Sequence, residues 1–563
     1  MRWQIPSVNP EAVARLSREL KVSALVGRLL VLRDVREPEA AERFLNPSLA
    51  HLHDPFLMAD MRAAVERLRC AIARKEKILI YGDYDVDGTM AVVVLLTALR
   101  GLGASVDAYI PHRLTDGYGM RVPVVEKAHS DGYSVVLSVD TGIREHEVLT
   151  RARGLGLDCI VTDHHLPGDR LPPACAILNP RRGDCRYPEK NLSGVGVAFK
   201  LAQTLVGERW TDRHLQSYLK IVALGTIADV VPLVGENRVI AHFGLAGLSG
   251  CSQRGLEALL EVAGLRGRAV GTGDVAFRLA PRVNAAGRME NARDVIDLFT
   301  TSDPVQARAI AERLDALNRE RQRVEDEILS AIIGQQELRP EKAAQYSLVF
   351  AGEGWHRGVI GIVAQRAVER YYRPTLVIGV ENGEGVGSGR AIKGFHLLEA
   401  LNQTSDLFER FGGHAQAAGF TLPAKRIPEL EGRFEAYARA TLRPEDLEPV
   451  LRVDGEVNLG DFTLDLFEQV KRLEPCGFGN PTPIFVARCV RLLAPPRVLK
   501  EKHLKLRVEQ GGASFDALGW GMAARASELA MGDRVDSAFT LDENDFQGEE
   551  SLQLILKDFK KRS

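Results

Sequence analysis

The sequence predicts an α/β protein with a mostly parallel sheet, a long connector helix, a second α/β domain and a C-terminal β-barrel of the OB type. Three observations predict this fold class. Short apolar strands alternate with helical segments from residue 77 to about 235, and such alternation gives right-handed crossovers and a parallel sheet. Residues 302–334 carry one apolar stripe at helical spacing. From about residue 450, short alternating segments are separated by turns, which is typical of a barrel.

The first α/β segment begins with a buried strand. Residues 78–81 (ILIY) form an apolar run bounded by Gly82, which is the pattern of a parallel strand. We expect Thr89 to cap the apolar helix of residues 89–100, which follows three aspartates and a glycine. The other elements expected here are strands at 106–110, 133–139 and 159–161 and helices at 123–129, 145–153 and 219–226.

A single long helix is expected to join two globular parts. Asp303 and Pro304 form a helix start, and Gly334 is expected to end the helix. About 30 residues at 1.5 Å each make a rod of roughly 45 Å, which suits a connector. The predicted domains are a helical extension at 1–70, a first α/β domain at 71–300, the connector at 301–340, a second α/β domain at 341–448 and the barrel at 449–563.

Composition restricts the class of protein without defining its partner. The chain has 45% hydrophobic and 26% charged residues and a formal net charge of −2, which is ordinary for a globular protein. A groove can be basic in such a molecule, so nucleic acid is not excluded. Seven cysteines without a C-x-x-C pair argue against disulfides and structural zinc. With no signal peptide and no apolar run that could span a membrane, we expect a cytoplasmic protein.

Metal-type side chains gather where the predicted strands end. Parallel strands present their carboxyl ends at one edge of the sheet, where ligands bind. A lone acidic turn is most often only solvated, and adjacent histidines are most often only a turn. Four clusters at one edge are harder to explain in that way, because uncompensated carboxylates repel one another. The residues are Asp83, Asp85, Asp87, Asp140, Asp163, His164, His165 and Asp229.

This set of side chains predicts a divalent metal site. Carboxylates with one or two imidazoles suit Mn²⁺, with Mg²⁺ as the alternative. The number of candidate ligands exceeds what one ion needs, and two ions sharing a bridging aspartate would use them fully. Such a pair clamps a phosphoryl group and activates water between the metals. The sequence therefore predicts two ions and hydrolysis of a phosphate ester.

Ordered motifs then give a specific resemblance over nearly the whole chain. DYDVDG, VDTG, DHH and GTIADVV, in that order, resemble the four motifs of the DHH phosphoesterase superfamily. WHRGVIGIVAQR, GSGR and GGHAQAAG resemble the DHH-associated domain. PRVNAAGRM, EPCGFGNPTPIF, HLKL and the N-terminal LRDVREPEAAERFLNP narrow the resemblance to the branch of single-strand-specific 5′→3′ DNA exonucleases. Thr141, which is not a ligand, departs from the asparagine that relatives often have.

The resemblance implies roles for the candidate residues. Asp83 and Asp85 would hold one metal, and Asp140 would bridge to the second. His165 would lie against the scissile phosphate or orient a ligand, so that His165 and Asp140 are the implied catalytic residues. The implied ligands of the second metal are Asp87, His164 and Asp229.

The resemblance also implies a path for DNA. Arg113, Ser388 and Arg390 match a pocket for the 5′-terminal phosphate, and a guanidinium fork beside glycine amides suits an anion. The further residues implied to face the DNA are Arg282, Asn284, Arg288, His356 and His414. For each of the first three taken singly, a helix cap or a salt bridge is nearly as good an explanation. For the two histidines, the alternative is a packed structural role.

The expected activity is release of 5′-mononucleotides from single-stranded DNA in repair and recombination. The resemblance implies a monomer that acts on a 5′ end with a helicase and a single-strand-binding protein as partners. Residues 502–508 alternate, with His503, Lys505 and Arg507 on one face, which fits either a DNA platform or a solvated barrel face. A small-substrate DHH phosphodiesterase and a non-catalytic scaffold are the alternatives. The predicted barrel argues against a small-substrate phosphodiesterase. The presence of a metal-type residue at every expected ligand position argues against a non-catalytic scaffold.

Overall fold

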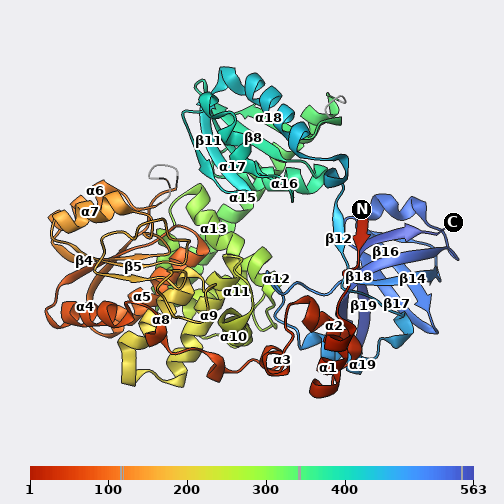
Figure 1. Ribbon diagram of the computed structural model, residues 1–563, viewed down its shortest axis with the longest axis horizontal. Coiled ribbons are helices and arrows are strands. Elements are labelled where there is room, and N and C mark those ends of the chain that lie inside the picture. Colours follow the sequence, from red (N-terminus) through yellow and green to blue (C-terminus); the bar gives the residue numbers. More distant parts are fainter. Residues whose placement is uncertain (114–116, 118, 340–343, 547–548, 563) are drawn as a thin grey trace. The chain divides into compact units, whose positions relative to one another are not determined.

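The computed structural model describes residues 1–113, 117, 119–339, 344–546 and 549–562 (Figure 1). The chain folds as two compact units. The barrel unit comprises Met1–Leu52, Pro232–His242 and Val450–Ser563, and the α/β unit comprises His53–Val231 and Phe243–Pro449. No helix among the described residues combines the length and apolarity needed to cross a membrane.

The first sheet of the α/β unit is entirely parallel, as predicted. Its strand order is β3-β2-β4-β5-β6, so the strands that carry the acidic motifs lie side by side. The short strand β6 was not predicted, because its three residues follow a proline-rich turn and have no periodicity of their own. The strands are β2 (Lys77–Tyr81), β3 (Ser105–Tyr109), β4 (Tyr133–Val139), β5 (Asp158–Thr162) and β6 (Ala176–Leu178).

Helices cover both faces of this sheet (Figure 1). Helices α6 and α7 pack together on β4 and β5, around a core that includes Val125, Val136 and Leu149. Helix α8 packs against both α4 and α5, all three contact the sheet's strands, and α9 packs on α5 and α8. Their bounds are α4 (Met61–Ala73), α5 (Val86–Gly101), α6 (Val122–Ser130), α7 (His146–Gly154), α8 (Gly194–Val206) and α9 (Asp212–Ala228).

The start of α5 corrects the prediction that Thr89 caps this helix. The helix begins at Val86, and Asp85 is the capping residue, because its carboxylate accepts a hydrogen bond of 2.9 Å from the amide of Gly88. Thr89 instead donates its hydroxyl to the Asp85 carbonyl within the helix. Asp87 consequently lies in the first helical turn, where the helix dipole favours a negative charge.

The segment between the first sheet and the second sheet is helical, and the predicted connector is helix α15. Helix α15 begins after the capping residue Asp303 with Pro304 in its first turn, as predicted. It continues to Glu337, so the expected end at Gly334 was wrong; a single glycine weakens a helix by only about 1 kcal/mol. The helices are α11 (Arg254–Val262), α12 (Thr272–Asp274), the π-helical turn η4 (Val275–Leu279), α13 (Ala280–Met289), α14 (Arg293–Thr300) and α15 (Pro304–Glu337).

The second sheet lies after the connector, in the order β10-β11-β9-β8-β7. Only β7 and β8 are parallel, and the glycine-rich segments form β9 and the β10–β11 hairpin. Helix α16 contacts β8, β9 and α15. The elements are β7 (Leu348–Glu353), α16 (Ile360–Tyr371), β8 (Thr375–Glu381), β9 (Glu384–Arg390), α17 (Leu397–Asn402), β10 (Arg410–Gly413), β11 (Ala417–Pro423) and α18 (Ile427–Thr441).

The barrel unit contains the predicted barrel. Strands β14, β18, β19, β17 and β16 form a closed ring, because β14 also pairs with β16. Leu504, Leu506 and Val508 of β16 point into the core, as their alternation predicts. The strands are β1 (Arg2–Gln4), β12 (Val450–Arg452), β13 (Gly455–Glu456), β14 (Phe485–Leu492), β15 (Arg497–Leu499), β16 (His503–Gln510), β17 (Ala513–Gly519), β18 (Arg534–Phe546) and β19 (Glu549–Lys561).

The N-terminal helices share the core of the barrel. Leu16, Leu29 and Phe44 belong to the same buried cluster as Phe485 and Phe539 of the barrel strands. The fully buried guanidinium of Arg238 lies over the ring of Phe44 and donates to backbone carbonyls at 44 and 472–475. The helices of this unit are α1 (Pro10–Leu20), α2 (Ala24–Leu32), α3 (Pro38–Leu45), α19 (Leu464–Lys471) and the first part of α10 (Gly235–Ala246).

Candidate metal centre and phosphate site

The carboxyl ends of two adjacent parallel strands supply the acidic side chains. Asp83 and Asp85 follow β2, and Asp140 follows β4. Asp140 has a φ of 58°, a conformation that is uncommon for residues other than glycine and that clusters at functional sites. Its amide donates to the Thr162 carbonyl of β5, which fixes the turn. The strand ends therefore bring the carboxylates together.

The start of α8 supports this cluster. The amides of Gly194 and Val195 donate to the two carboxylate oxygens of Asp87, over 2.6 and 2.9 Å. A Cβ on Gly194 would lie 2.6 Å from Oδ1 of Asp140, so only glycine fits there. A helix N-terminus stabilises negative charge. This contribution was not predicted, although the segment Ser193–Gly196 has the serine cap and the glycines that indicate it.

His164 lies at the centre of the acidic residues. Its Nε2 is 3.1 Å from Oδ1 of Asp140, 3.5 Å from Oδ2 of Asp229 and 3.8 Å from Oδ2 of Asp87. Asp229 is the C-cap residue of α9. Each of the four residues contributes one potential ligand atom, from a different element.

The potential ligands form three overlapping groups. Asp83, Asp85 and Asp140 make one group, and Asp87, His164 and Asp229 make a second; in each, the ligand atoms lie within 4.8 Å of one another. The third group is Asp140, His164 and His165. Asp140 therefore connects the first group to the imidazoles. The first two groups contain the residues that the resemblance implied as ligands of two metals, and the bridge through Asp140 stays a prediction.

The chemistry of these side chains fits divalent cations. Among the described residues, Oδ1 of Asp83, Oδ1 of Asp140, Nε2 of His164 and Oδ2 of Asp229 are buried without a hydrogen-bond partner. Burial and then repulsion between the carboxylates raise the pKa of Asp83 to about 8, of Asp87 to about 7 and of Asp229 to about 9. Burial and then the charge of His165 lower the pKa of His164 to about 3. A neutral imidazole among carboxylates that lack positive partners is a donor set for metal ions.

Asp163 has a different role from its acidic neighbours. Its Oδ1 accepts hydrogen bonds from Nδ1 of His165 over 2.7 Å and from the amides of His164 and His165, and its Oδ2 accepts from the amide of Ile143. Although burial opposes it, these hydrogen bonds lower the pKa of Asp163 and raise that of His165. Asp163 therefore orients a half-exposed imidazole beside Asp140, a role that the sequence did not reveal.

A cluster of guanidinium groups lies in the same unit. The guanidinium of Arg113 stacks over the ring of Tyr84 at 5.0 Å. Burial, and then repulsion from Arg113, lowers the pKa of Arg288 to about 10. The same two causes lower the pKa of Arg390. None of the three arginines forms an ion pair with a described residue. Guanidinium groups that lie close together without acidic partners favour the binding of an anion.

Ser388 and a helix N-terminus complete this cationic site. Arg390 donates to the Ser388 hydroxyl over 3.1 Å. A Cβ on Gly361, in the first turn of the twelve-residue helix α16, would lie 3.2 Å from Oγ of Ser388 and 3.3 Å from Nη2 of Arg390. Arg288 donates to the Gly358 carbonyl, which links α13 to the turn before α16. Helix N-termini and arginine forks are the groups that bind phosphate.

The remaining predicted DNA contacts differ in their surroundings. Arg282 is paired with Asp315 of α15 over 2.9 Å and donates to the Arg278 carbonyl, which is the salt-bridge role left open above. Asn284 is half-buried on α13. His356 accepts the Gly358 amide in a turn, whereas His414 is exposed in the β10–β11 hairpin.

The basic face of strand β16 is partly neutralised. Lys505 and Arg507 both pair with Asp516 of β17, over 2.8 and 3.0 Å. His503, the third residue of that face, packs its ring edge-on against Trp520 at 4.7 Å. The face therefore combines paired charges with an aromatic edge.

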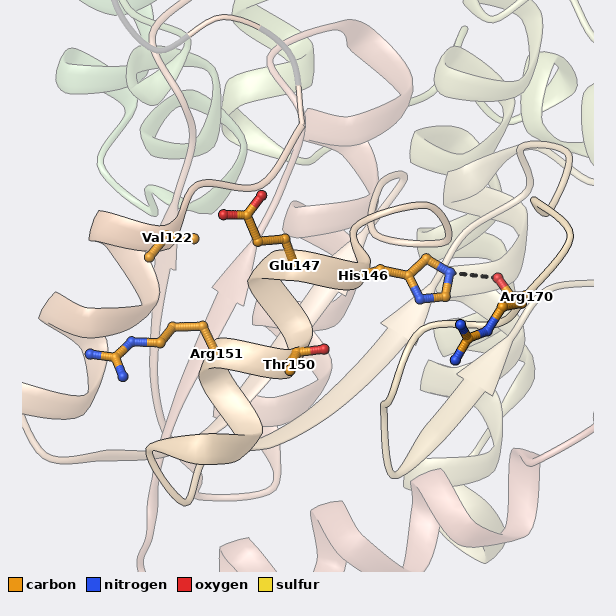
Figure 2. Close-up of a pocket in the computed structure, with 6 residues that line it drawn as sticks. All are labelled: Val122, His146, Glu147, Thr150, Arg151 and Arg170. Atoms are coloured by element: carbon orange, nitrogen blue, oxygen red, sulfur yellow. Dashed lines mark hydrogen bonds between the residues drawn. The ribbon is translucent and has the colours of Figure 1, made fainter.

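A surface hollow beside α7 contains none of the predicted site residues (Figure 2). It is lined by Val122, His146, Glu147, Thr150, Arg151 and Arg170. The ring of His146 faces the Arg170 backbone, and its Nε2 lies 2.6 Å from that carbonyl oxygen (Figure 2). The hollow is distinct from the metal-type cluster.

Comparisons with known proteins agree with this geometry. Residues 77–226 match the DHH family N-terminal domain, residues 342–440 the DHHA1 domain and residues 453–558 the RecJ OB domain. The fold and the site thus define a phosphoesterase of the DHH type.

Relatives that match nearly the whole chain identify the family within this class of phosphoesterases. The single-stranded-DNA-specific exonuclease RecJ of Bacillus subtilis is 38% identical over 99% of this chain and 70% of its own length, and that of Escherichia coli is 35% identical over 99% of both. The crystal structure of RecJ in complex with Mn²⁺ from Thermus thermophilus matches with 31% identity and a TM-score of 0.83, over 100% of this chain and 80% of that one. A second crystal structure of that RecJ contains Mg²⁺. The chain belongs to the RecJ family.

Proposed function

We propose that this protein is a metal-dependent exonuclease that removes 5′-mononucleotides from single-stranded DNA, in the 5′→3′ direction, by two-metal hydrolysis. The observation that carries the proposal is the pair of ligand groups connected through Asp140, with buried carboxylate oxygens that lack hydrogen-bond partners. The resemblance to single-stranded-DNA-specific exonucleases along the whole chain supports the substrate.

The residues divide the work of the reaction. Asp83 and Asp85 would hold one ion, and Asp87, His164 and Asp229 the other, with Asp140 between them. These residues would hold two Mn²⁺ ions, or Mg²⁺ as the alternative, and such ions would supply a clamp for the phosphoryl group and a bound water of lowered pKa. Asp163 orients the His165 ring, and the half-exposed imidazole beside Asp140 would contact the scissile phosphate.

A second anion site would give the enzyme its direction. A metal pair brackets a phosphodiester that looks similar from either side. Arg113, Ser388 and Arg390 would bind the terminal 5′-phosphate, whose charge approaches −2 against −1 for an internal diester. Arg288, whose guanidinium has no acidic partner among the described residues, would strengthen this site. Asn284, His356 and His414 would lie along the strand.

The wider setting is proposed from the same resemblance. The enzyme would act as a monomer in the cytoplasm, during DNA repair and recombination, on strands supplied by a helicase and covered by a single-strand-binding protein. The domains would be the parts at 1–70, 71–300, 301–340, 341–448 and 449–563. The barrel, which matches an OB domain, would bind the strand beyond the active site.

Strand selectivity tests the proposal. Three 5′-phosphorylated substrates are digested with Mn²⁺ and the products resolved by length: a single strand, a blunt duplex and a duplex with a 5′ single-stranded tail. We expect mononucleotides from the single strand and from the tail, and resistance of the blunt duplex. Efficient digestion of the blunt duplex without a helicase would contradict the proposal. Cleavage of dinucleotides alone would favour a small-substrate phosphodiesterase.

A further inference from the structure

Phe277 is unusually exposed for a phenylalanine. Its side chain is 81% exposed, against 60% for Phe478 and 58% for Trp520. It lies in the α/β unit, between α12 and α13, and is not one of the residues considered above. An aromatic ring so open to water loses the free energy that burial would give, about 25 cal/mol per Å² of apolar area.

A π-helical turn places the ring outside. Residues Val275–Leu279 form this turn, with Val275 and Leu279 buried and the Ala280 amide bonded to the Val275 carbonyl. Wide turns of this kind are frequent at functional sites. Arg278 anchors the turn, because it pairs with Asp274 over 3.2 Å and donates to the Ala263 carbonyl. The ring is therefore presented from a braced backbone.

The ring continues one face of α13. Pro281, Asn284 and Arg288 follow Phe277 at spacings of four, three and four, which is one side of a helix. All three are half-exposed, whereas the intervening Val283 and Ala286 are buried. Arg288 belongs to the guanidinium cluster, so this face leads from the candidate phosphate site to Phe277.

The Arg288 end of the face lies beside metal-type residues. A Cβ on Gly287 would lie 2.8 Å from the carbonyl oxygen of Tyr84, so α13 ends against the residue between Asp83 and Asp85. At the other end of the face, the π-helical turn packs on α9. The face therefore begins at the candidate phosphate site, next to the segment of Asp83 and Asp85, and extends along α13 to Phe277.

We propose that Phe277 stacks on a nucleobase of the bound single strand, on the 3′ side of the cleaved bond. The inference deepens the proposed function and rests on it. The eleven helical steps from Phe277 to Arg288 span about 16 Å at 1.5 Å each. At roughly 3.4 Å per stacked nucleotide, this span corresponds to about five nucleotides. Base–aromatic stacking tolerates any sequence, which suits an enzyme that degrades DNA of every composition.

The test compares strands that do and do not reach the ring. Release of the first nucleotide is measured with Mn²⁺ on a trinucleotide and on a twelve-nucleotide strand, both 5′-phosphorylated. For Phe277→Ala and Phe277→Leu we expect KM for the long strand to rise about fivefold or more, with kcat and the trinucleotide KM unchanged. Phe277→Trp keeps a ring and should keep the wild-type KM. Val305→Ala, at a residue 75% exposed on α15, is the matched control.

An abasic scan locates the stacked base and separates this inference from the proposed function. Single abasic sites are moved along a twelve-nucleotide strand, and binding is measured by fluorescence anisotropy without divalent metal. The affinity of the wild type should fall when the abasic site lies about five nucleotides from the 5′ end. The affinity of Phe277→Ala should not change when the abasic site is at that position. This pattern would support the inference even if cleavage had another direction. Equal profiles for the two proteins, or a KM unchanged in Phe277→Ala on the long strand, would overturn it.

Discussion

Nε2 of His164 lies 3.1 Å from Oδ1 of Asp140, and neither atom has a hydrogen-bond partner among the described residues. Burial lowers the pKa of the imidazole and raises that of the carboxyl. A neutral ring cannot neutralise the aspartate, so the pair is not a salt bridge. Two lone-pair donors at this separation instead suit neighbouring positions around metal ions.

Asp140→Asn should abolish cleavage, because the amide keeps the shape of the side chain but cannot bridge two cations. We expect a larger loss of kcat than the roughly 10–100-fold that removing a supporting partner costs. The melting temperature of the metal-free variant should not fall, since one repulsive charge is removed. Asp107→Asn, at the surface of β3, is a control outside the cluster. Near-normal Mn²⁺-dependent activity of Asp140→Asn would contradict the bridging role.

Asp163→Asn should impair His165 without removing metal. The carboxylate holds the His165 ring and raises its pKa, so its loss lowers the pKa of that imidazole. We expect kcat to drop about 10–100-fold and any limb of the pH–rate profile that reports the imidazolium to move to lower pH. Metal stoichiometry, measured by elemental analysis of the purified variant, should be that of wild type. Loss of metal in parallel with activity would make Asp163 a ligand instead.

The metal-free protein should become less stable as pH rises above neutrality. Burial and mutual repulsion raise the pKa of Asp83 to about 8 and of Asp229 to about 9, against about 4 in an unfolded chain. Between these values the folded state binds more protons, so the free energy of unfolding falls as pH increases. The lowered pKa of His164 changes the free energy of unfolding only below about pH 6.5, which is the pKa of histidine in an unfolded chain.

Thermal unfolding at pH 6.5 and 8.5 measures this effect. In EDTA, we expect the melting temperature of the wild type to be lower at pH 8.5 than at pH 6.5. The difference between the two melting temperatures should be smaller for Asp229→Asn. Added Mn²⁺ should restore the melting temperature of the wild type at pH 8.5, because its binding displaces the protons. A metal-free melting temperature that rises between these pH values would show that the carboxylates are compensated in another way.

Arg390→Ala should remove the preference for a 5′-phosphate. Arg390 and Ser388 are hydrogen-bonded beside the start of α16, and each charge-assisted hydrogen bond to phosphate is worth about 1.5–3 kcal/mol before solvent losses. Wild type and variant are compared on 5′-phosphorylated and 5′-hydroxyl strands. Arg357→Ala is a control, because that arginine is bound to surface glutamates. If Arg390→Ala kept the full preference, this pocket would not set the direction.

The sequence was sufficient for features that depend on periodicity and on ordered motifs. The parallel strands, the start of the connector helix and the convergence of the acidic clusters follow from short apolar runs with polar ends. Contacts from distant segments were not predictable. The Gly194 amide on Asp87 is one example, and the shared core of Phe44 and Phe485 is another. Asp163 had the same appearance in the sequence as the candidate ligands, and only its hydrogen bonds distinguish it.

The most direct test of the account follows the two ends of one strand. A 5′-phosphorylated single strand carries one label in its first nucleotide and another at its 3′ end, and digestion with Mn²⁺ is sampled over time. We expect the 5′ label to appear at once as a mononucleotide while the 3′-labelled strand shortens stepwise, with both events absent in Asp140→Asn. Retention of the 5′ label in a shrinking ladder, or internal fragments as first products, would contradict it.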